Sequence, residues 1–81
     1  MRPIRFELRG HHITLDALLK ASGLADSGGQ AKALIAGARV QVNGATETRR
    51  GRKLRPGDQV LLAGQQVQLQ GPADPDAQHE P

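Results

Sequence analysis

Positive charge is concentrated in one short stretch of this 81-residue sequence. Residues 49–55 read RRGRKLR, with five cationic residues in seven positions and no acid. Arginine forks donate paired hydrogen bonds that match phosphate oxygens, and glycine lets a ligand approach the backbone. A solvated loop that guards a sheet edge is the alternative, but an unbalanced cluster repels itself. We therefore favour a polyanion-binding site formed by this stretch.

A second candidate anion contact lies at the predicted start of a helix. Ser27 precedes two glycines, each of which costs ~1 kcal/mol relative to alanine inside a helix. One reading is that the open N–H groups of Gly28 and Gly29 face an anion, with Lys32 one turn further along. The other reading is that the glycines let two helices approach closely. Gln30 completes the set of candidate binding residues at this position.

Patterns for catalysis, metal binding and base stacking are weak. The sequence has no cysteine, and its adjacent His11 and His12 would point in opposite directions in an extended segment. His79 is the third histidine, and Phe6 is the only aromatic residue, whereas single-strand binders usually carry several exposed aromatics. We find no nucleophile–base constellation, phosphate-loop motif or spaced carboxylate pair. The sequence thus predicts a non-enzymatic protein without metal, cofactor or small-molecule substrate.

Charge and composition divide the chain into two parts. All 11 Lys and Arg residues but only five of the eight acids lie in residues 1–70, a net charge of +6 that suggests a polyanionic partner. Residues 71–81 hold three of the five prolines, three acids and no aliphatic residue larger than alanine. We predict one domain over 1–70 and a disordered acidic, proline-rich tail over 71–81. The tail is a solubilising end, or alternatively it transiently covers the basic face.

The sequence shows neither the signature of a membrane span nor that of a signal peptide. No stretch approaches the ~20 apolar residues of a membrane span. The N-terminus lacks the apolar run of a signal peptide, and the lack of cysteine fits a reducing compartment. We therefore expect a cytoplasmic monomer without a membrane partner.

Hydrophobic spacing predicts the elements that would hold these residues in place. Apolar and charged residues alternate over 4–9, which predicts a half-buried strand with Phe6 facing the core. An apolar helical stripe predicts a first helix over about 15–22, with Thr14 as N-cap and a left-handed Gly23 after its end. Only a short link separates this helix from the next, so the two must pack as a tight pair.

The second helix is predicted over 28–36. A capping box joins Ser27 and Gln30 at its start, and Gly37 marks its end. Lys32 lies away from the apolar stripe, toward solvent. The side chains that the stripe predicts to be buried are Ala31, Leu34, Ile35 and Ala38.

Strands and turns fill the second half of the domain. Strands are predicted over 40–42, 45–48, 59–63 and 66–70. Asn43-Gly44 predicts a type I′ hairpin turn, and two more turns are predicted at 56–58 and Gly64-Gln65. The basic stretch then lies in a loop or irregular edge. The whole order predicts a small α+β domain: an N-terminal strand, two packed helices, and a short antiparallel or mixed sheet of about four strands.

The order of these motifs resembles the S-four-type RNA-binding domain, the alpha-L motif named after ribosomal small-subunit protein four. The resemblance spans about 14–62 and includes ARVQVNG at 38–44 and RPGDQV at 55–60. Stand-alone bacterial members are similar at 27–32, SGGQAK, and at 47–50, ETRR.

The resemblance implies an RNA face made of the start of the second helix and the neighbouring basic loop. Many family members carry arginine where Gly28 follows Ser27, which shifts the expected contact toward Lys32 and the loop. The residues implied are Ser27, Gln30, Lys32, Arg49, Arg50, Arg52 and Lys53.

Structured RNA is the expected partner, and the resemblance implies ribosomal RNA or tRNA. The same basic face would also suit an acidic protein in ribosome assembly or RNA modification. We expect a change of Arg49, Arg50 and Arg52 together to alanine to lower RNA affinity with little loss of fold stability.

Overall fold

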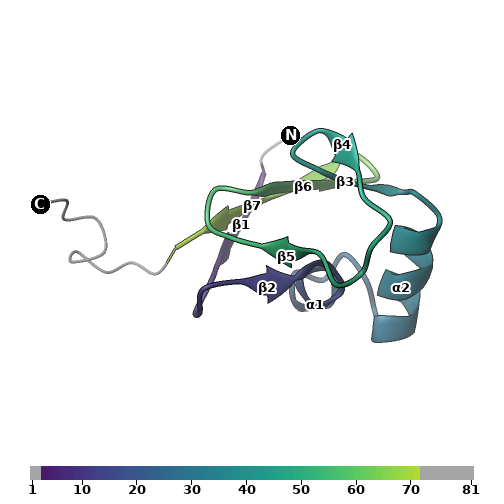
Figure 1. The fold of residues 1–81 in the computed structure, drawn as a ribbon, viewed down its shortest axis with the longest axis horizontal. Coiled ribbons are helices and arrows are strands. Elements are labelled where there is room, and N and C mark those ends of the chain that lie inside the picture. The colour runs from purple at the N-terminus through teal and green to yellow at the C-terminus, as the bar shows by residue number, and fades with distance from the viewer. Residues whose placement is uncertain (1–2, 72–81) are drawn as a thin grey trace, which may run out of the picture.

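Nine short elements follow one another along residues 3–71, the part of the chain that the computed structural model describes (Figure 1). Residues 1–2 and 72–81 lie outside the described residues, and with them most of the predicted tail and His79. In chain order the elements are β1 (Ile4–Glu7), β2 (Ile13–Thr14), α1 (Leu15–Ala21), α2 (Gly28–Ala36), β3 (Val40–Val42), β4 (Ala45–Thr46), β5 (Lys53–Leu54), β6 (Gln59–Leu62) and β7 (Gln65–Gln70).

A five-stranded mixed sheet forms the larger part of the fold. Its strand order is β1-β7-β6-β3-β4, in which β1 runs parallel to β7 and the other neighbours are antiparallel. The short strands β2 and β5 pair antiparallel in a separate ribbon, which lies next to α1 (Figure 1). The predicted α+β class and mixed sheet are confirmed. The N-terminal strand joins that sheet at its edge, so the sheet has five strands.

One face of the sheet is buried and the other is polar, because side chains alternate along each strand. In β6, Val60 and Leu62 are buried, whereas Gln59 and Leu61 are exposed. The buried strand residues share one core with the apolar side chains of α1, α2 and the β2–β5 ribbon, so these elements cover the same side of the sheet. Phe6 packs against this core and is partly buried, as predicted.

The start of α1 lacks its predicted side-chain cap. Thr14 has the extended backbone of an N-cap residue, but its hydroxyl makes no capping hydrogen bond. The residue belongs to β2, and the next N–H group, that of Leu15, donates to the carbonyl of Arg52 at 2.9 Å. A tertiary contact therefore replaces the local cap. At the other end, Gly23 has a φ of 85°, the predicted left-handed conformation.

α2 begins and ends at the predicted residues. Ser27 Oγ accepts a hydrogen bond from Gln30 N at 3.1 Å, which is the predicted N-cap. The Gln30 side chain accepts from the N–H of Asp26, whereas a capping box would bring it to the N–H of Ser27. The second half of the predicted box is thus displaced by one residue.

The exit from α2 differs from the prediction in one residue. Ala31 and Ile35 are fully buried and Leu34 is partly buried, as predicted. Ala38, however, is exposed, and it adopts the left-handed conformation with a φ of 61°, whereas Gly37 has a φ of −79°. The chain leaves the helical stripe at this point, so the side chain of Ala38 no longer faces the core.

Two-residue turns close both hairpins of the larger sheet. The residues of the 43–44 turn have φ values of 52° and 86°, as a type I′ turn requires. The later hairpin turns at 63–64, with φ values of 52° and 79°, because Leu62 pairs directly with Gln65. The predicted turn at 64–65 was therefore one residue late. The return strand predicted over 45–48 is also shorter, ending at residue 46.

The β2–β5 ribbon has no counterpart in the sequence prediction. Ile13 pairs with Leu54 and Thr14 pairs with Lys53, so part of the basic stretch is a strand and not a loop. Two-residue strands have no detectable periodicity. The local signal that remains is Leu54, an apolar residue among cations, which is fully buried.

We expect Ser27→Ala to destabilise the domain by about 1 kcal/mol (range roughly 0.5–2), because the N–H of Gln30 loses its acceptor at the start of α2. Urea unfolding followed by circular dichroism measures this loss. Thr14→Val is the control, since it removes a hydroxyl that makes no capping bond. Equal losses in the two variants would contradict the different roles of the two residues.

Candidate functional site

Backbone and core contacts hold the basic stretch in place. Leu54 is fully buried, whereas Lys53 and Arg55 on either side of it are exposed. The carbonyls of Arg50 and Arg52 accept hydrogen bonds from the first two N–H groups of α1, at 3.2 and 2.9 Å. The cationic side chains are therefore displayed by a backbone that is tied to both the core and a helix.

The stretch surrounds an open hollow of about 530 Å³, which we call the basic groove. Of the predicted site residues in the stretch, Arg49, Arg52 and Lys53 line it, and Arg50 does not. Arg55 also lines it and was not among the predicted site residues. The residues that form the basic groove are Arg49, Gly51, Arg52, Lys53 and Arg55.

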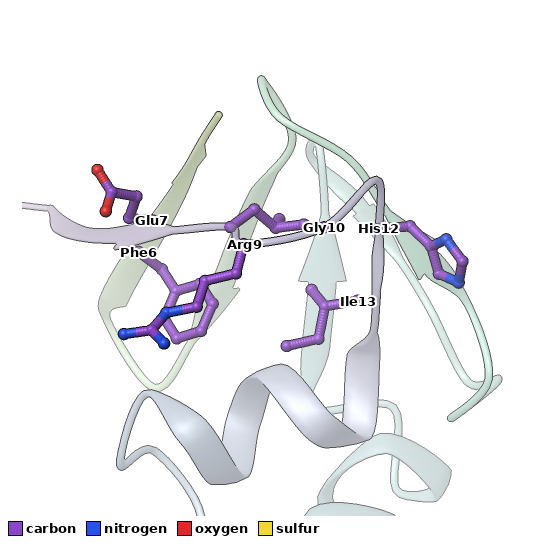
Figure 2. Close-up of a pocket in the computed structure, with 7 residues that line it drawn as sticks. Phe6, Glu7, Arg9, Gly10, His12 and Ile13 are labelled. Carbon is purple, nitrogen blue, oxygen red and sulfur yellow. The ribbon is translucent and has the colours of Figure 1, made fainter. Parts of the chain in front are cut away.

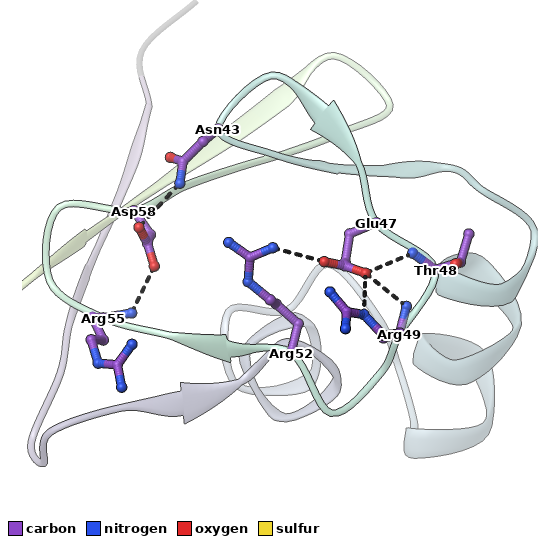
Figure 3. A network of polar contacts seen from close by, with 7 residues as sticks. All are labelled: Asn43, Glu47, Thr48, Arg49, Arg52, Arg55 and Asp58. Carbon is purple, nitrogen blue, oxygen red and sulfur yellow. Dashed lines mark hydrogen bonds and ion pairs between the residues drawn. The ribbon is translucent and has the colours of Figure 1, made fainter.

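A buried acid, Glu47, organises two of these arginines (Figure 3). Only 6% of Glu47 is exposed. Its Oε2 accepts hydrogen bonds from Thr48 N and Arg49 N, both at 3.1 Å, and from Arg49 Nε at 3.2 Å. Its Oε1 accepts from Arg52 Nη1 at 2.8 Å. The carboxylate is therefore fully engaged by the start of the basic stretch.

Sequence reasoning did not find the role of Glu47. The available signal was its position, because it is the sole acid between Asp26 and Asp58 and stands two residues before the cluster. Its contacts change the expectation for the triple alanine variant of Arg49, Arg50 and Arg52. Two of those three side chains hold a buried carboxylate, so their loss would also destabilise the fold.

Acid is expected to weaken the fold through Glu47. Hydrogen bonds from Arg52 and then Arg49 lower the pKa of Glu47 from 4.5 to about 2. Because this pKa is lower in the folded than in the unfolded chain, the ionised carboxylate stabilises the fold above pH 4.5, and that contribution is lost as the pH falls toward 2. Urea unfolding of the wild type and Glu47→Gln should give a difference that is constant near neutrality and shrinks below pH 4.5. A difference independent of pH would contradict the ion pairs.

The predicted 56–58 turn positions Arg55 at the far end of the groove. Gly57 has a φ of 98°, and the Asp58 carboxylate accepts hydrogen bonds from Arg55 N at 2.8 Å and from Asn43 Nδ2 at 3.1 Å. The amide oxygen of Asn43 in turn accepts from Gln59 N at 2.9 Å. Figure 3 shows the guanidinium of Arg55 directed away from this network. Asp58 is thus structural, as its place in a turn predicts.

The start of α2 presents an open helix terminus. Gly28 and Gly29 are exposed, and a Cβ at Gly28 would meet no atom within 4 Å, while one at Gly29 would meet only Ser27 Oγ, at 3.9 Å. Close helix packing therefore does not explain these glycines. Ser27 and Gln30 use their side-chain oxygens for capping, and Lys32 is exposed, as predicted.

The structure brings together three of the four predicted residues of the basic stretch, Arg49, Arg52 and Lys53. Within residues 3–71 no hydrogen bond connects the stretch to the start of α2, whereas two backbone hydrogen bonds connect it to α1. A joint contact of Lys32 and the basic groove with one ligand stays a prediction.

A second hollow, of about 310 Å³, lies between β1 and β2 (Figure 2). Its lining includes the apolar residues Phe6, Leu8 and Ile13, together with Arg9. His12 also borders it, but Figure 2 shows the imidazole pointing away from Phe6 and Ile13. This hollow presents mixed apolar and charged surface, whereas four of the five residues that line the basic groove are cationic.

Two further findings concern residues 3–71. No group of three His, Cys, Asp or Glu side chains is placed to hold a metal ion. Neither α1 nor α2 has the length and apolar character that a membrane-spanning helix requires. The basic groove, lined by four cationic residues and Gly51, remains the candidate binding surface.

Comparison with known proteins gives this surface a context. Residues 6–70 match the S4 domain family. The chain is 46% identical over 65 residues to the protein of Escherichia coli K12 named "Putative RNA-binding protein YbcJ", across 79% of this chain and 93% of that protein. YbcJ of Shigella flexneri matches with the same identity and coverage. The solution structure of E. coli YbcJ, described as revealing an alfaL motif involved in RNA binding, aligns with a TM-score of 0.68 and 42% identity over 86% of this chain and 90% of that chain.

Proposed function

The chain belongs to the S4 domain family, and from this premise we propose that it binds structured RNA by gripping the phosphate backbone in the basic groove. One observation carries the proposal: the groove is lined by four cationic residues and one glycine. Cationic side chains that share one concave surface sum their fields and attract a polyanion. The name of the E. coli YbcJ protein and the description of its solution structure both mention RNA binding, which supports the choice of RNA.

The groove keeps hydrogen-bond donors for such a ligand. Glu47 engages Nε of Arg49 and Nη1 of Arg52, and each guanidinium retains its other N–H groups. The side chain of Arg49 is 77% exposed. Lys53 and Arg55 have no ion-pair partner within residues 3–71, so their charge is available to phosphate.

The proposed mode is recognition of backbone and shape. Phe6, the single aromatic residue, packs against the core, so the chain lacks the row of exposed aromatics on which single-strand binders stack bases. Folded RNA instead offers closely spaced phosphates. The proposed target is ribosomal RNA or tRNA, bound by a cytoplasmic monomer that catalyses nothing.

The start of α2 is a second proposed contact. The N–H groups of Gly28 and Gly29 are the first two of the helix, where a helix lacks internal acceptors and favours an anion. Exposed glycines leave room for a phosphate to approach them. Lys32 adds charge on the same helix.

A salt titration tests this proposal. Binding to a structured RNA hairpin should weaken linearly with log salt, with a slope of roughly −0.7 to −0.9 for each phosphate neutralised. Absence of binding at ~50 mM salt, where phosphate contacts are strong, would contradict it. A pull-down from cell lysate with and without nuclease would then identify the alternative, an acidic protein partner that stays bound after the RNA is destroyed.

A further inference from the structure

We propose that Glu47, although it carries the charge that RNA repels, is a positioning residue that holds Arg49 and Arg52 in the geometry needed to bind phosphate. The inference rests on the proposed function and goes beyond it. An acidic residue would then contribute to an RNA-binding surface that charge composition alone would define only by its cationic residues.

The contacts of Glu47 join the two arginines to the sheet. Its backbone N–H donates to the carbonyl of Val40 in β3 at 2.9 Å, which fixes the carboxylate relative to the core. The carboxylate then accepts from both guanidinium groups, one on each oxygen. Figure 3 shows Arg49 and Arg52 converging on it from separate points of the chain.

The hydrogen bonds that Glu47 accepts leave other N–H donors of both guanidinium groups for a ligand. It accepts from Nε of Arg49, so both terminal nitrogens of that guanidinium remain for a ligand. It accepts from Nη1 of Arg52, so Nε and Nη2 of that group remain. Each arginine can therefore bind Glu47 and a phosphate oxygen at the same time.

Preorganisation of the Arg49 and Arg52 side chains is the expected reason for tighter ligand binding. A free arginine side chain loses rotamer freedom when it binds a ligand, and that loss weakens the complex. Glu47 imposes the loss when the protein folds, because it is buried and holds both side chains before any ligand arrives. A ligand then meets an ordered pair of guanidinium groups.

Simple electrostatics predicts the opposite effect of removing the Glu47 charge. Neutralising an acid beside a polyanion site raises the local positive charge, which by itself tightens binding. Loss of the fixed positions of Arg49 and Arg52 weakens RNA binding. The two effects have opposite signs, so the direction of the change reports which one dominates.

Glu47→Gln tests the proposal, with Glu7→Gln as the charge-matched control on the exposed edge strand β1. We expect Glu47→Gln to lower hairpin affinity by about tenfold, the effect of two disordered arginines, and Glu7→Gln to leave it within about twofold. Circular dichroism and urea unfolding establish that each variant is folded at the assay temperature. A folded Glu47→Gln protein that binds RNA as tightly as the wild type, or more tightly, would overturn the proposal.

A double-mutant cycle separates positioning from a general structural effect. In a protein that already carries Arg49→Gln and Arg52→Gln, adding Glu47→Gln should cause no further loss of RNA affinity, because the groups it positions are gone. An undiminished tenfold loss in that background would show that Glu47 acts through the fold as a whole, which contradicts the proposal.

A measurement without RNA keeps the inference distinct from the proposed function. Relaxation of the Nε–H groups by NMR should show Arg49 and Arg52 ordered in the wild type and mobile in Glu47→Gln. Ordered side chains in a wild type that fails to bind RNA would reject the proposed function alone. Equal mobility in the two proteins would reject the positioning role, whatever the protein binds.

Discussion

Lys53→Gln combined with Arg55→Gln is expected to lower affinity for structured RNA roughly tenfold near ~100 mM salt and to make the salt slope shallower by about 1.4 to 1.8. These two side chains line the basic groove and take no part in the contacts of Glu47. The change therefore removes two proposed phosphate contacts and leaves the ion pairs of Glu47 with Arg49 and Arg52 in place. Fluorescence anisotropy with a labelled hairpin across a salt series measures both quantities.

The matched control removes two positive charges elsewhere. Arg5 is exposed on β1, opposite Gln68 on the polar outer face of the sheet, and Lys20 is exposed near the end of α1. Arg5→Gln with Lys20→Gln leaves the net charge equal to that of the groove variant. A similar loss of affinity and slope in both double variants would mean that overall charge, and not the basic groove, attracts the RNA.

Leu54→Ala is expected to destabilise the domain by about 2–5 kcal/mol, because Leu54 is fully buried and its removal leaves a cavity. Total stabilities of ~5–15 kcal/mol are usual for a domain, and a small one has little reserve, so a sizeable unfolded population is the expected result. Thermal unfolding measures the loss. This variant also links stability to function, because Leu54 is the buried residue of β5 and stands between the groove residues Lys53 and Arg55.

Leu61→Ala is the control for this variant. Leu61 sits on the outer face of β6 and is 40% exposed, so its truncation leaves no enclosed cavity. We expect a change within roughly 0.5 kcal/mol. If the two leucines cost the same, the burial of β5 against the core would be in doubt.

The features that followed from the sequence are those with local physical causes. The bounds of α2 were predictable because a serine cap and a glycine stand at its two ends. The 43–44 turn was predictable because asparagine and glycine both tolerate positive φ. The resemblance to the S-four-type domain and its alpha-L motif, confirmed by the family match and the YbcJ structure, rested on several such motifs in one order.

The features that the sequence did not reveal depend on tertiary contacts. Ala38 and Ala63 adopt left-handed conformations that cost ~1–2 kcal/mol, so no local rule assigns them there. The packing around them sets where helix and strand end. Thr14 looks like a helix cap, but the basic stretch supplies the acceptor for the next N–H instead.

The same limit applied to the candidate site. Charge pattern identified the basic stretch, but not that β5 runs through it or that Arg55 lines the groove while Arg50 does not. The role of Glu47 could not be predicted for the same reason, because its arginine partners come within reach only in the folded chain. The residue set at the start of α2 stays a prediction.

The most direct measurement of the central claim is a map of backbone amide chemical-shift changes when a structured RNA hairpin is added to the protein. We expect the largest changes at 49–55, with a second group at 28–32 and little effect on the outer sheet residues of β6 and β7. Changes concentrated on that outer face, or around the second hollow near Phe6, with the basic stretch unaffected, would contradict it.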